Sequence, residues 1–376
     1  MTVVTCSKEN EVDLPTDPST SPPTVMKIEW DHSSEKRISH DTYSAEYPRI
    51  RRIGGDTLFL VYRSGPQGHT WDNVALRKSY NNGETWEPFI LLARDDNPAY
   101  YGFSDPEMLV LENGWIIVAY EGRGNPDSNE NNNIQVRISK DRGVTWGSPI
   151  IATKGRSWEP AMIQMPDGEI QLFYASEARW WPSPEPRPQE ILMIRSHDNG
   201  ENWSDPEQVA YDAGTRDGMP SPLLLNDNKG IIFVIENVGL ARSPWVIHSS
   251  LSSNWNYDTL PSISNNRRWR AINENVHGGG PYIIQLPSGE TILSCHIAGG
   301  RNISGWRKNT MAVYIGDSDA KNFRDRTYPW PNLPLSEGAI FNSLFLKDDS
   351  TIVALSSRIF SDGHGELFWK EGRIIR

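Results

Sequence analysis

Apolar and polar residues alternate along most of this chain in a pattern that recurs six times. Each copy has two apolar segments of strand length joined by a short turn rich in glycine or aspartate, which is typical of a β-hairpin. The first segments of the six copies contain Tyr47, Asp105, Glu159, Met219, Gly280 and Phe341. A unit of roughly 58 residues that recurs in this way indicates a repeat architecture such as a propeller.

An eight-residue motif follows three of the predicted hairpins at nearly equal spacing. Its copies span Ser79–Trp86, Ser139–Trp146 and Ser196–Trp203, and a degenerate copy spans Gly316–Phe323. In the three complete copies an Asp or Asn can bond nearby backbone N–H groups, a glycine can take the left-handed conformation, and a tryptophan can pack on the sheet. A calcium-binding loop is the alternative, but the motif has too few carboxylates. The motif resembles the Asp box of sialidase-type β-propellers, where its role is structural.

Six hairpin repeats predict an all-β fold, namely a six-bladed β-propeller of four-stranded antiparallel blades with Asp-box turns. The Asp box is expected to join the third and fourth strands of a blade. The sixth repeat has no Asp box, so we predict that residues 25–30 supply its outer strand and close the ring, which leaves no sheet edge free. Residues 26–376 would then form a single catalytic domain.

Residues 1–25 are predicted to be a flexible tail. They contain Pro, Ser, Thr and acidic residues with almost no apolar residue, which is typical of a linker. Cys6 followed by such a linker resembles the start of a mature bacterial lipoprotein, whose cysteine is acylated, and an ordinary flexible terminus is the alternative. The lipoprotein interpretation predicts a protein of the bacterial cell surface or periplasm, attached to a membrane through Cys6; otherwise the protein would be secreted.

Composition and charge exclude several classes of function. The chain has 376 residues, of which 48 are acidic and 37 basic, and its formal charge of −11 disfavours DNA or RNA as a partner. Two cysteines cannot form a disulfide framework or a cysteine-rich zinc site, and no stretch approaches the length of a membrane-spanning apolar segment. The 15 Trp, 30 Gly and 27 Pro are typical of turn-rich β proteins that bind sugars.

Polar residues occupy nearly every position where a first strand begins or a second strand ends. Antiparallel pairing places these positions on one face of the ring, so they should surround the mouth of the propeller; the alternative is that each is a solvated strand end. Glu159 and Glu236 are the candidate catalytic residues. Glu159 follows Trp158 and precedes Pro160, which fixes its backbone, and Glu236 ends an apolar run that would desolvate its carboxyl group and raise its pKa. The candidate substrate-binding residues are Tyr47, Arg49, Arg63, Asp105, Trp158, Arg179 and His277.

Paired carboxylates across a sugar site are typical of glycoside hydrolysis. We expect Glu159 and Glu236 to face one another from neighbouring blades, and we take Glu236 as the nucleophile. Tryptophans near the mouth, such as Trp158, could stack on sugar rings, although packing is the alternative for each of them. The expected partner is therefore an oligo- or polysaccharide, bound by a monomer.

Two further features of the mouth bear on this hypothesis. The Pro-rich insertion of residues 178–188 is predicted to be a rigid loop that overhangs the mouth. No metal and no cofactor is predicted, since His277 and His296 share a blade but lack an evident third ligand.

Two families with this fold differ in the residues that they need at the mouth. Sialidases need an arginine triad and a Tyr nucleophile, which lies in a Tyr-Ser-x-Leu pattern at the start of the last inner strand. This chain has Phe341-Asn342-Ser343-Leu344 there, and Phe has no hydroxyl group for covalent catalysis. The order Tyr47-Pro48-Arg49-Ile50 in the first repeat also departs from the Arg-Ile-Pro order of sialidases.

Over roughly residues 40–360 the chain resembles the exo-α-1,5-L-arabinanase family more closely. The resemblance rests on Tyr47-Pro48-Arg49, Trp158-Glu159-Pro160, Ile235-Glu236-Asn237, Gly280-Pro281-Tyr282 and Leu286-Pro287-Ser288-Gly289-Glu290-Thr291. It implies retaining release of arabinobiose or similar short oligosaccharides from linear arabinan, with Glu159 and Glu236 as the catalytic pair. A sialidase or another exo-glycosidase of this fold is one alternative, and a non-catalytic glycan- or protein-binding propeller is the other.

Overall fold

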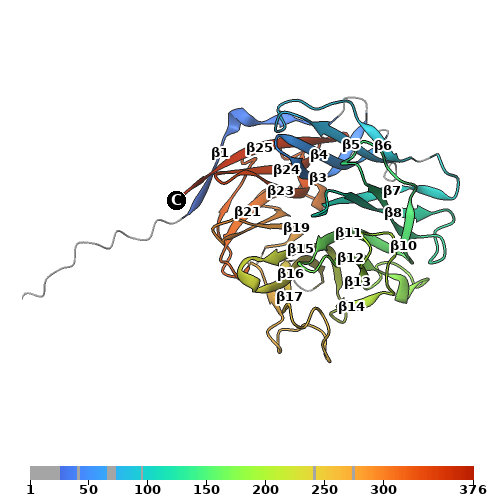
Figure 1. Ribbon diagram of the computed structural model, residues 1–376. Helices are drawn as coiled ribbons and strands as arrows, with labels where there is room; N and C mark the ends of the chain where they lie inside the picture. Colours follow the sequence, from blue (N-terminus) through green and yellow to red (C-terminus); the bar gives the residue numbers. More distant parts are fainter. Residues whose placement is uncertain (1–25, 40–42, 66–72, 95, 240–242, 273–275) are drawn as a thin grey trace, which may run out of the picture.

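Six antiparallel sheets surround a central axis in the computed structural model, which describes residues 26–39, 43–65, 73–94, 96–239, 243–272 and 276–376. The first strand of each sheet lies nearest the axis, and the others follow outward (Figure 1). The prediction of an all-β, six-bladed propeller is thereby confirmed. The predicted tail and Cys6 lie outside the described residues.

Blades one to five each consist of four consecutive strands. Blades one and two contain β3 (Ser44–Gly54), β4 (Thr57–Gly65), β5 (Asn73–Ser79), β6 (Ile90–Ala93), β7 (Tyr100–Val110), β8 (Ile116–Gly124), β9 (Asn133–Ser139) and β10 (Ile150–Lys154). Blades three and four contain β11 (Ser157–Gln164), β12 (Ile170–Ser176), β13 (Glu190–Ser196), β14 (Glu207–Ala210), β15 (Arg216–Leu225), β16 (Gly230–Val238), β17 (Pro244–Ser249) and β18 (Arg268–Arg270). Blade five contains β19 (Gly278–Gln285), β20 (Thr291–Ile297), β21 (Thr310–Gly316) and β22 (Arg324–Thr327).

The sixth blade joins the two ends of the described chain. Its strands are β23 (Gly338–Asp348), β24 (Thr351–Ile359), β25 (Gly365–Ile375) and β1 (Lys27–Trp30). Strand β1 pairs antiparallel with β25, with Lys27 opposite Ile375 and Trp30 opposite Gly372. The short strand β2 (Lys36–Arg37) also pairs with β25. The prediction that an N-terminal strand closes the ring is confirmed.

Short 3₁₀ helices interrupt some of the connections. They are η1 (His32–Ser34), η2 (Ala178–Trp180), η3 (Asn226–Asn228) and η4 (Trp306–Lys308). No helix in the described part of the chain is long and apolar enough to cross a membrane.

The hydrophobic core is divided among the interfaces between blades. Within the described residues, buried apolar side chains form one cluster at each of the six interfaces. At the junction of blades six and one, Leu58 and Leu60 pack with Leu355 and Trp369. Each blade therefore packs against such a cluster on both of its sides. Full burial of one large apolar side chain contributes about 1.5–3 kcal/mol to this packing.

The Asp boxes fold as predicted. In the second copy the N–H of Thr145 donates to Oδ1 of Asp141 at 2.8 Å, and the N–H of Gly143 donates to Oγ of Ser139 at 2.7 Å. Gly143 has φ +84°, and a Cβ there would collide with the ring of Phe59. The other two complete copies form the same pair of bonds. The three boxes lie at the ends of blades one, two and three that are opposite the mouth, so they stabilise the ring and do not form the site.

The closing strand provides a test of the fold. Ile28 on β1 is buried in the cluster between blades five and six, whereas its neighbour Glu29 is exposed. We expect Ile28→Ala to lower the free energy of unfolding by about 2–4 kcal/mol through loss of packing, and Glu29→Ala to change it by less than about 0.5 kcal/mol. Urea denaturation followed by tryptophan fluorescence measures both. Equal effects of the two substitutions would contradict the role of β1 in ring closure.

Candidate active site

A β-bulge interrupts each inner strand at its mouth end. The pairing of each inner strand with the second strand of its blade shifts register there. One residue in each bulge has a left-handed backbone, with φ between 50° and 63°; these are Tyr47, Asp105, Glu159, Met219, Gly280 and Phe341. Proline follows five of the six, as expected because a bulge is one of the few places in a sheet that tolerates proline. The bulges re-aim side chains at the axis.

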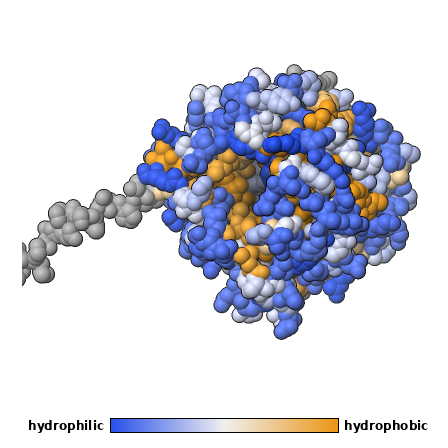
Figure 2. Space-filling model, in the orientation of Figure 1, coloured by the Kyte–Doolittle hydropathy of each residue, from blue (hydrophilic) through white to orange (hydrophobic). Residues whose placement is uncertain are grey.

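A cavity of about 480 Å³ lies at this end of the inner strands. Figure 2 shows the molecular surface hollowed near the axis of the ring. All six blades contribute to the lining, which consists of Arg63, Ser104, Asp105, Trp158, Glu159, Met219, Glu236, Val238, His277, Gly278, Gly279, His296, Trp306, Arg307, Asn309 and Phe341. Its size is that of a small-molecule site.

Glu159 and Glu236 both line this cavity, from neighbouring blades. The N–H of Met219 donates to Oε2 of Glu159 at 2.8 Å, and the N–H of Gly280 donates to Oε2 of Glu236 at 2.9 Å. A Cβ on Gly218 would lie 3.4 Å from Oε2 of Glu159 and 3.6 Å from Cγ of Glu236. The structure therefore brings the two side chains together in one cavity, against the same glycine.

The pKa of Glu159 is raised well above its usual range. The largest cause is burial, which disfavours the charged form, and the next are the nearby carboxyl groups of Glu236 and Asp105. The N–H of Met219 opposes this rise only in part. Glu159 is thus poised to carry a proton while facing a second carboxyl group.

Glycines make the space that the Glu236 side chain occupies. A Cβ on Gly279 would stand 2.6 Å from Nε2 of His296 and 2.8 Å from Oε2 of Glu236, and a Cβ on Gly280 would stand 2.9 Å from the His296 ring. Only a residue without a side chain fits at either position. The run of three glycines before Pro281 therefore brings a histidine and a carboxyl group to the same wall.

His277 and His296 both line the cavity but differ in environment. His277 is exposed at the rim, whereas His296 is buried. Burial lowers the pKa of His296 to about 4, so its imidazole is neutral at neutral pH. Among the described residues, no group of three or more His, Cys, Asp and Glu side chains is placed to hold a metal ion.

Asp105 and Arg63 line the cavity on the side of blades one and two. Oγ of Ser104 donates to Oδ1 of Asp105 at 2.8 Å. Burial raises the pKa of Asp105, and the positive charge of Arg63 opposes that rise. Arg63 forms an ion pair with Glu46, which also accepts a 2.6 Å hydrogen bond from Nη2 of Arg307. One glutamate thus bridges the two arginines of the cavity wall.

Trp158 forms part of the wall next to Glu159. The guanidinium of Arg123 lies over its ring at 3.9 Å, which holds the indole in place. Arg123 also contacts the carboxyl group of Glu121, a fully buried residue whose pKa burial raises to about 8. This wall is therefore supported from behind by a buried, hydrogen-bonded pair of side chains.

Three of the predicted substrate-binding residues do not line the cavity, although Tyr47 lies close enough to Asp105 and Glu159 for their charges to add to the rise that burial causes in its pKa. Arg49 is 4% exposed, and its Nε donates to Glu107 at 3.1 Å below the cavity. Tyr47 lies in the bulge itself and is buried, and the guanidinium carbon of Arg49 is 4.0 Å from the centre of its ring. Arg179, on η2, lies over Trp180 at 5.7 Å. None of the three lines the cavity, in contrast to Arg63, Asp105, Trp158 and His277.

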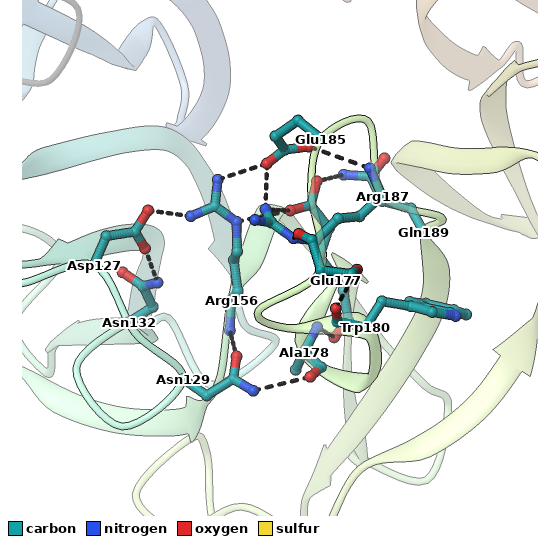
Figure 3. Close-up of polar contacts among 12 residues, drawn as sticks. Asp127, Asn129, Asn132, Arg156, Glu177, Ala178, Trp180, Glu185, Arg187 and Gln189 are labelled. Carbon is teal, nitrogen blue, oxygen red and sulfur yellow. Dashed lines mark hydrogen bonds and ion pairs between the residues drawn. The ribbon is translucent and has the colours of Figure 1, made fainter.

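The predicted overhanging loop is anchored by arginines (Figure 3). Glu185 forms ion pairs with Arg156 and Arg187, and both arginines also pair with the buried Glu177. These contacts and that of Arg216 lower the pKa of Glu177 despite its burial. Glu177, which follows a second strand, is thus a structural anchor for the loop.

Sequence reasoning did not propose Trp306, Arg307 or Asn309 for the site. They lie on or next to η4, in the connection between the second and third strands of blade five. The sequence offered one signal for these residues. Each second strand ends at the mouth, so the connection that follows it must begin there. Met219 could have been proposed because it occupies the same repeat position as Asp105 and Glu159.

Comparison with known proteins agrees with this architecture. The model of the BNR repeat-like domain family matches residues 29–326. This chain belongs to that family. A sialidase of Paraclostridium sordellii is 21% identical to this BNR repeat-like chain over 354 residues, which cover 82% of this chain and 81% of the sialidase.

Solved structures with the same fold include two that contain arabinobiose. The GH93 α-L-arabinofuranosidase of Fusarium graminearum superposes with a TM-score of 0.66 at 17% identity, over 93% of this chain and 97% of that one. An α-L-arabinanase of Penicillium chrysogenum gives a TM-score of 0.64 at 15% identity, over 92% and 96% of the two chains. At these identities the likeness shows the fold.

The electrostatic coupling between Glu236 and Glu159 in the cavity is testable. We expect Glu236→Gln to lower the pKa of Glu159, because it removes a negative charge that favours the protonated form. The pKa can be measured by infrared or ¹³C NMR titration of the carboxyl groups. Glu190→Gln is the control, since Glu190 is buried in blade three outside the cavity. An unchanged or raised pKa in Glu236→Gln would contradict the proximity of the two side chains.

Proposed function

We propose that this chain is a retaining glycoside hydrolase that acts on a neutral glycan, most like an exo-α-1,5-L-arabinanase that releases arabinobiose. The observation that carries the proposal is the pair of carboxyl groups, Glu159 and Glu236, that flank Gly218 in one cavity. Two carboxyl groups on either side of a glycosidic bond suffice for hydrolysis without a cofactor. Membrane attachment through Cys6 and a monomeric state stay predictions.

The raised pKa of Glu159 suits it to be the general acid. In the first step it donates its proton to the glycosidic oxygen as the bond to the anomeric carbon breaks, and the Glu236 carboxylate forms a bond to that carbon. In the second step Glu159 takes a proton from water, whose oxygen replaces Glu236 at the anomeric carbon. The leaving group gains one proton and the sugar one hydroxyl group, so the sum is hydrolysis with retention.

The charges of the cavity favour a neutral sugar over an anionic one. Arg63 and Arg307 line the wall, but both bind the carboxyl group of Glu46. Asp105, Glu159 and Glu236 add acidic groups to the same cavity. A substrate carboxylate would therefore meet acidic groups and arginines that are already paired.

A sialidase is the second candidate, because the curated relatives found by sequence are sialidases. Phe341 stands against it, since the resemblance to sialidases would require a tyrosine nucleophile at that position. A non-catalytic glycan-binding propeller is the third candidate, and a lack of turnover would favour it.

Activity can be tested with linear arabinan, debranched arabinan and a sialyl glycoside, with chromatography of the products. We expect a disaccharide from the arabinans and no product from the sialyl glycoside. Glu159→Gln and Glu236→Gln should each lower kcat on arabinan about 10³-fold or more, because each removes a group that acts in the transition state. Glu190→Gln should retain activity. Turnover of the sialyl glycoside alone would overturn the proposal in favour of a sialidase.

The roles of the two glutamates can be separated by azide rescue. With an aryl glycoside of arabinobiose, Glu159→Ala should accept azide in the second step and give a glycosyl azide of retained configuration. Glu236→Ala should give the azide of inverted configuration, because azide then takes the place of the nucleophile. NMR of the products distinguishes the two. The opposite pattern would exchange the assigned roles while keeping the catalytic pair.

A further inference from the structure

Glu177 is a buried side chain at the mouth end of blade three, outside the lining of the cavity. Its Oε2 accepts a hydrogen bond from Nε of Arg156 at 2.7 Å, and its Oε1 accepts one from Nη2 of Arg216 at 2.7 Å. Nη1 of Arg187 and Nε2 of Gln189 donate to it at 3.4 and 3.2 Å (Figure 3). Burial would raise the pKa of Glu177, but the hydrogen bonds from Arg156 and Arg216 lower it below its usual value. Glu177 is therefore a carboxylate whose two oxygens are both held by arginine.

The two arginines bound at 2.7 Å occupy the same repeat position in neighbouring blades. Arg156 lies three residues before Glu159, and Arg216 lies three residues before Met219, whose N–H donates to Oε2 of Glu159. The other four blades have different residues at this position, namely Ser44, Gly102, His277 and Gly338. Arginine thus occurs there only in the two blades that provide the catalytic pair. The carboxylate of Glu177 between these arginines ties the mouth ends of β11 and β15 together.

Gln189 extends these contacts to the catalytic pair. Its side chain is buried, and because its Nε2 donates to Glu177, its Oε1 is the atom left to face Gly218. A Cβ on Gly218 would lie 3.3 Å from this Oε1, 3.4 Å from Oε2 of Glu159 and 3.6 Å from Cγ of Glu236. Three side chains therefore meet at one glycine, and Glu177 sets the orientation of the amide among them.

We propose that Glu177 is a positioning residue for the catalytic pair. This inference rests on the proposed function and deepens it. Through its two arginines the carboxylate fixes β11 and β15 relative to one another, and with them the distance from Glu159 to the N–H of Met219. Through Gln189 it keeps an amide oxygen beside the two catalytic carboxyl groups. Glu177 lies outside the cavity that receives the sugar, so its loss should impair the reaction step more than substrate binding.

The test compares Glu177→Gln with the unchanged full-length chain on linear arabinan. We expect kcat to fall about 10- to 100-fold while KM changes less than about threefold, because a displacement of about 1 Å near the reacting atoms costs up to about 100-fold in rate. Hydrogen-exchange mass spectrometry should show faster exchange of the Met219 amide, since the strand that carries it is held less firmly. Gln189→Leu leaves the arginine contacts in place and should lower kcat about tenfold with little change in melting temperature, so it carries the kinetic test if Glu177→Gln does not fold.

The matched control is Glu169→Gln, in the same blade but at the end opposite the mouth. Glu169 is also buried, and its Oε1 accepts hydrogen bonds from Nη1 of Arg195 and Nε2 of Gln171 at 2.6 and 2.7 Å. Its substitution should lower the melting temperature without changing kcat or the exchange of Met219. Equal kcat and equal Met219 exchange in Glu177→Gln and in this control would overturn the positioning role and leave the proposed function intact. Absence of turnover by the unchanged chain would overturn the proposed function, and Met219 exchange alone would then decide whether Glu177 fixes the strands.

Discussion

The left-handed bulge at the mouth end of each inner strand is the constraint on which the site depends. A non-glycine residue in this conformation costs about 1–2 kcal/mol, and the chain accepts it in five of its six blades. The apolar clusters between blades are large enough to offset that cost, because they hold each inner strand from both sides. As a result, the bulge residue occupies the same position near the axis in blade after blade, and the type of residue there determines what that blade contributes to the site.

Catalytic potential arises from one of these positions, from a residue of the next blade and from the space around the two. Glu159 occupies a bulge, whereas Glu236 comes from the second strand of the next blade and reaches the cavity beside Gly279 and Gly280. Burial alone would raise the pKa of Glu159, and the neighbouring carboxyl groups raise it further. Backbone N–H groups of the bulges in blades four and five fix one oxygen of each glutamate. The same distortion that aims the side chains thus supplies the donors that orient them.

The sequence predicts well what repeats and poorly what occurs once. Six hairpins, the Asp boxes and the closing strand follow from local patterns, and Glu159 and Glu236 follow from their places at strand ends. Arg49 was expected at the mouth because it lies near the start of the first strand, but the bulge shifts the register and returns Arg49 to the ladder opposite Val61. Trp306 was not proposed, because the sequence of the connection between the second and third strands does not repeat from blade to blade, although the place of this connection at the mouth does.

The charge of one wall of the cavity depends on a single glutamate. Arginines at the mouth would attract an anionic sugar if they were unopposed, yet Glu46 binds both Arg63 and Arg307. The bond to Arg307 also holds η4 and therefore Trp306 in place. Glu46 accordingly acts twice, once on the electrostatic potential of the cavity and once on its shape. A neutral sugar that stacks on an aromatic ring uses both effects, whereas a carboxylated sugar would have to displace Glu46 from its arginines and release the wall that Glu46 supports.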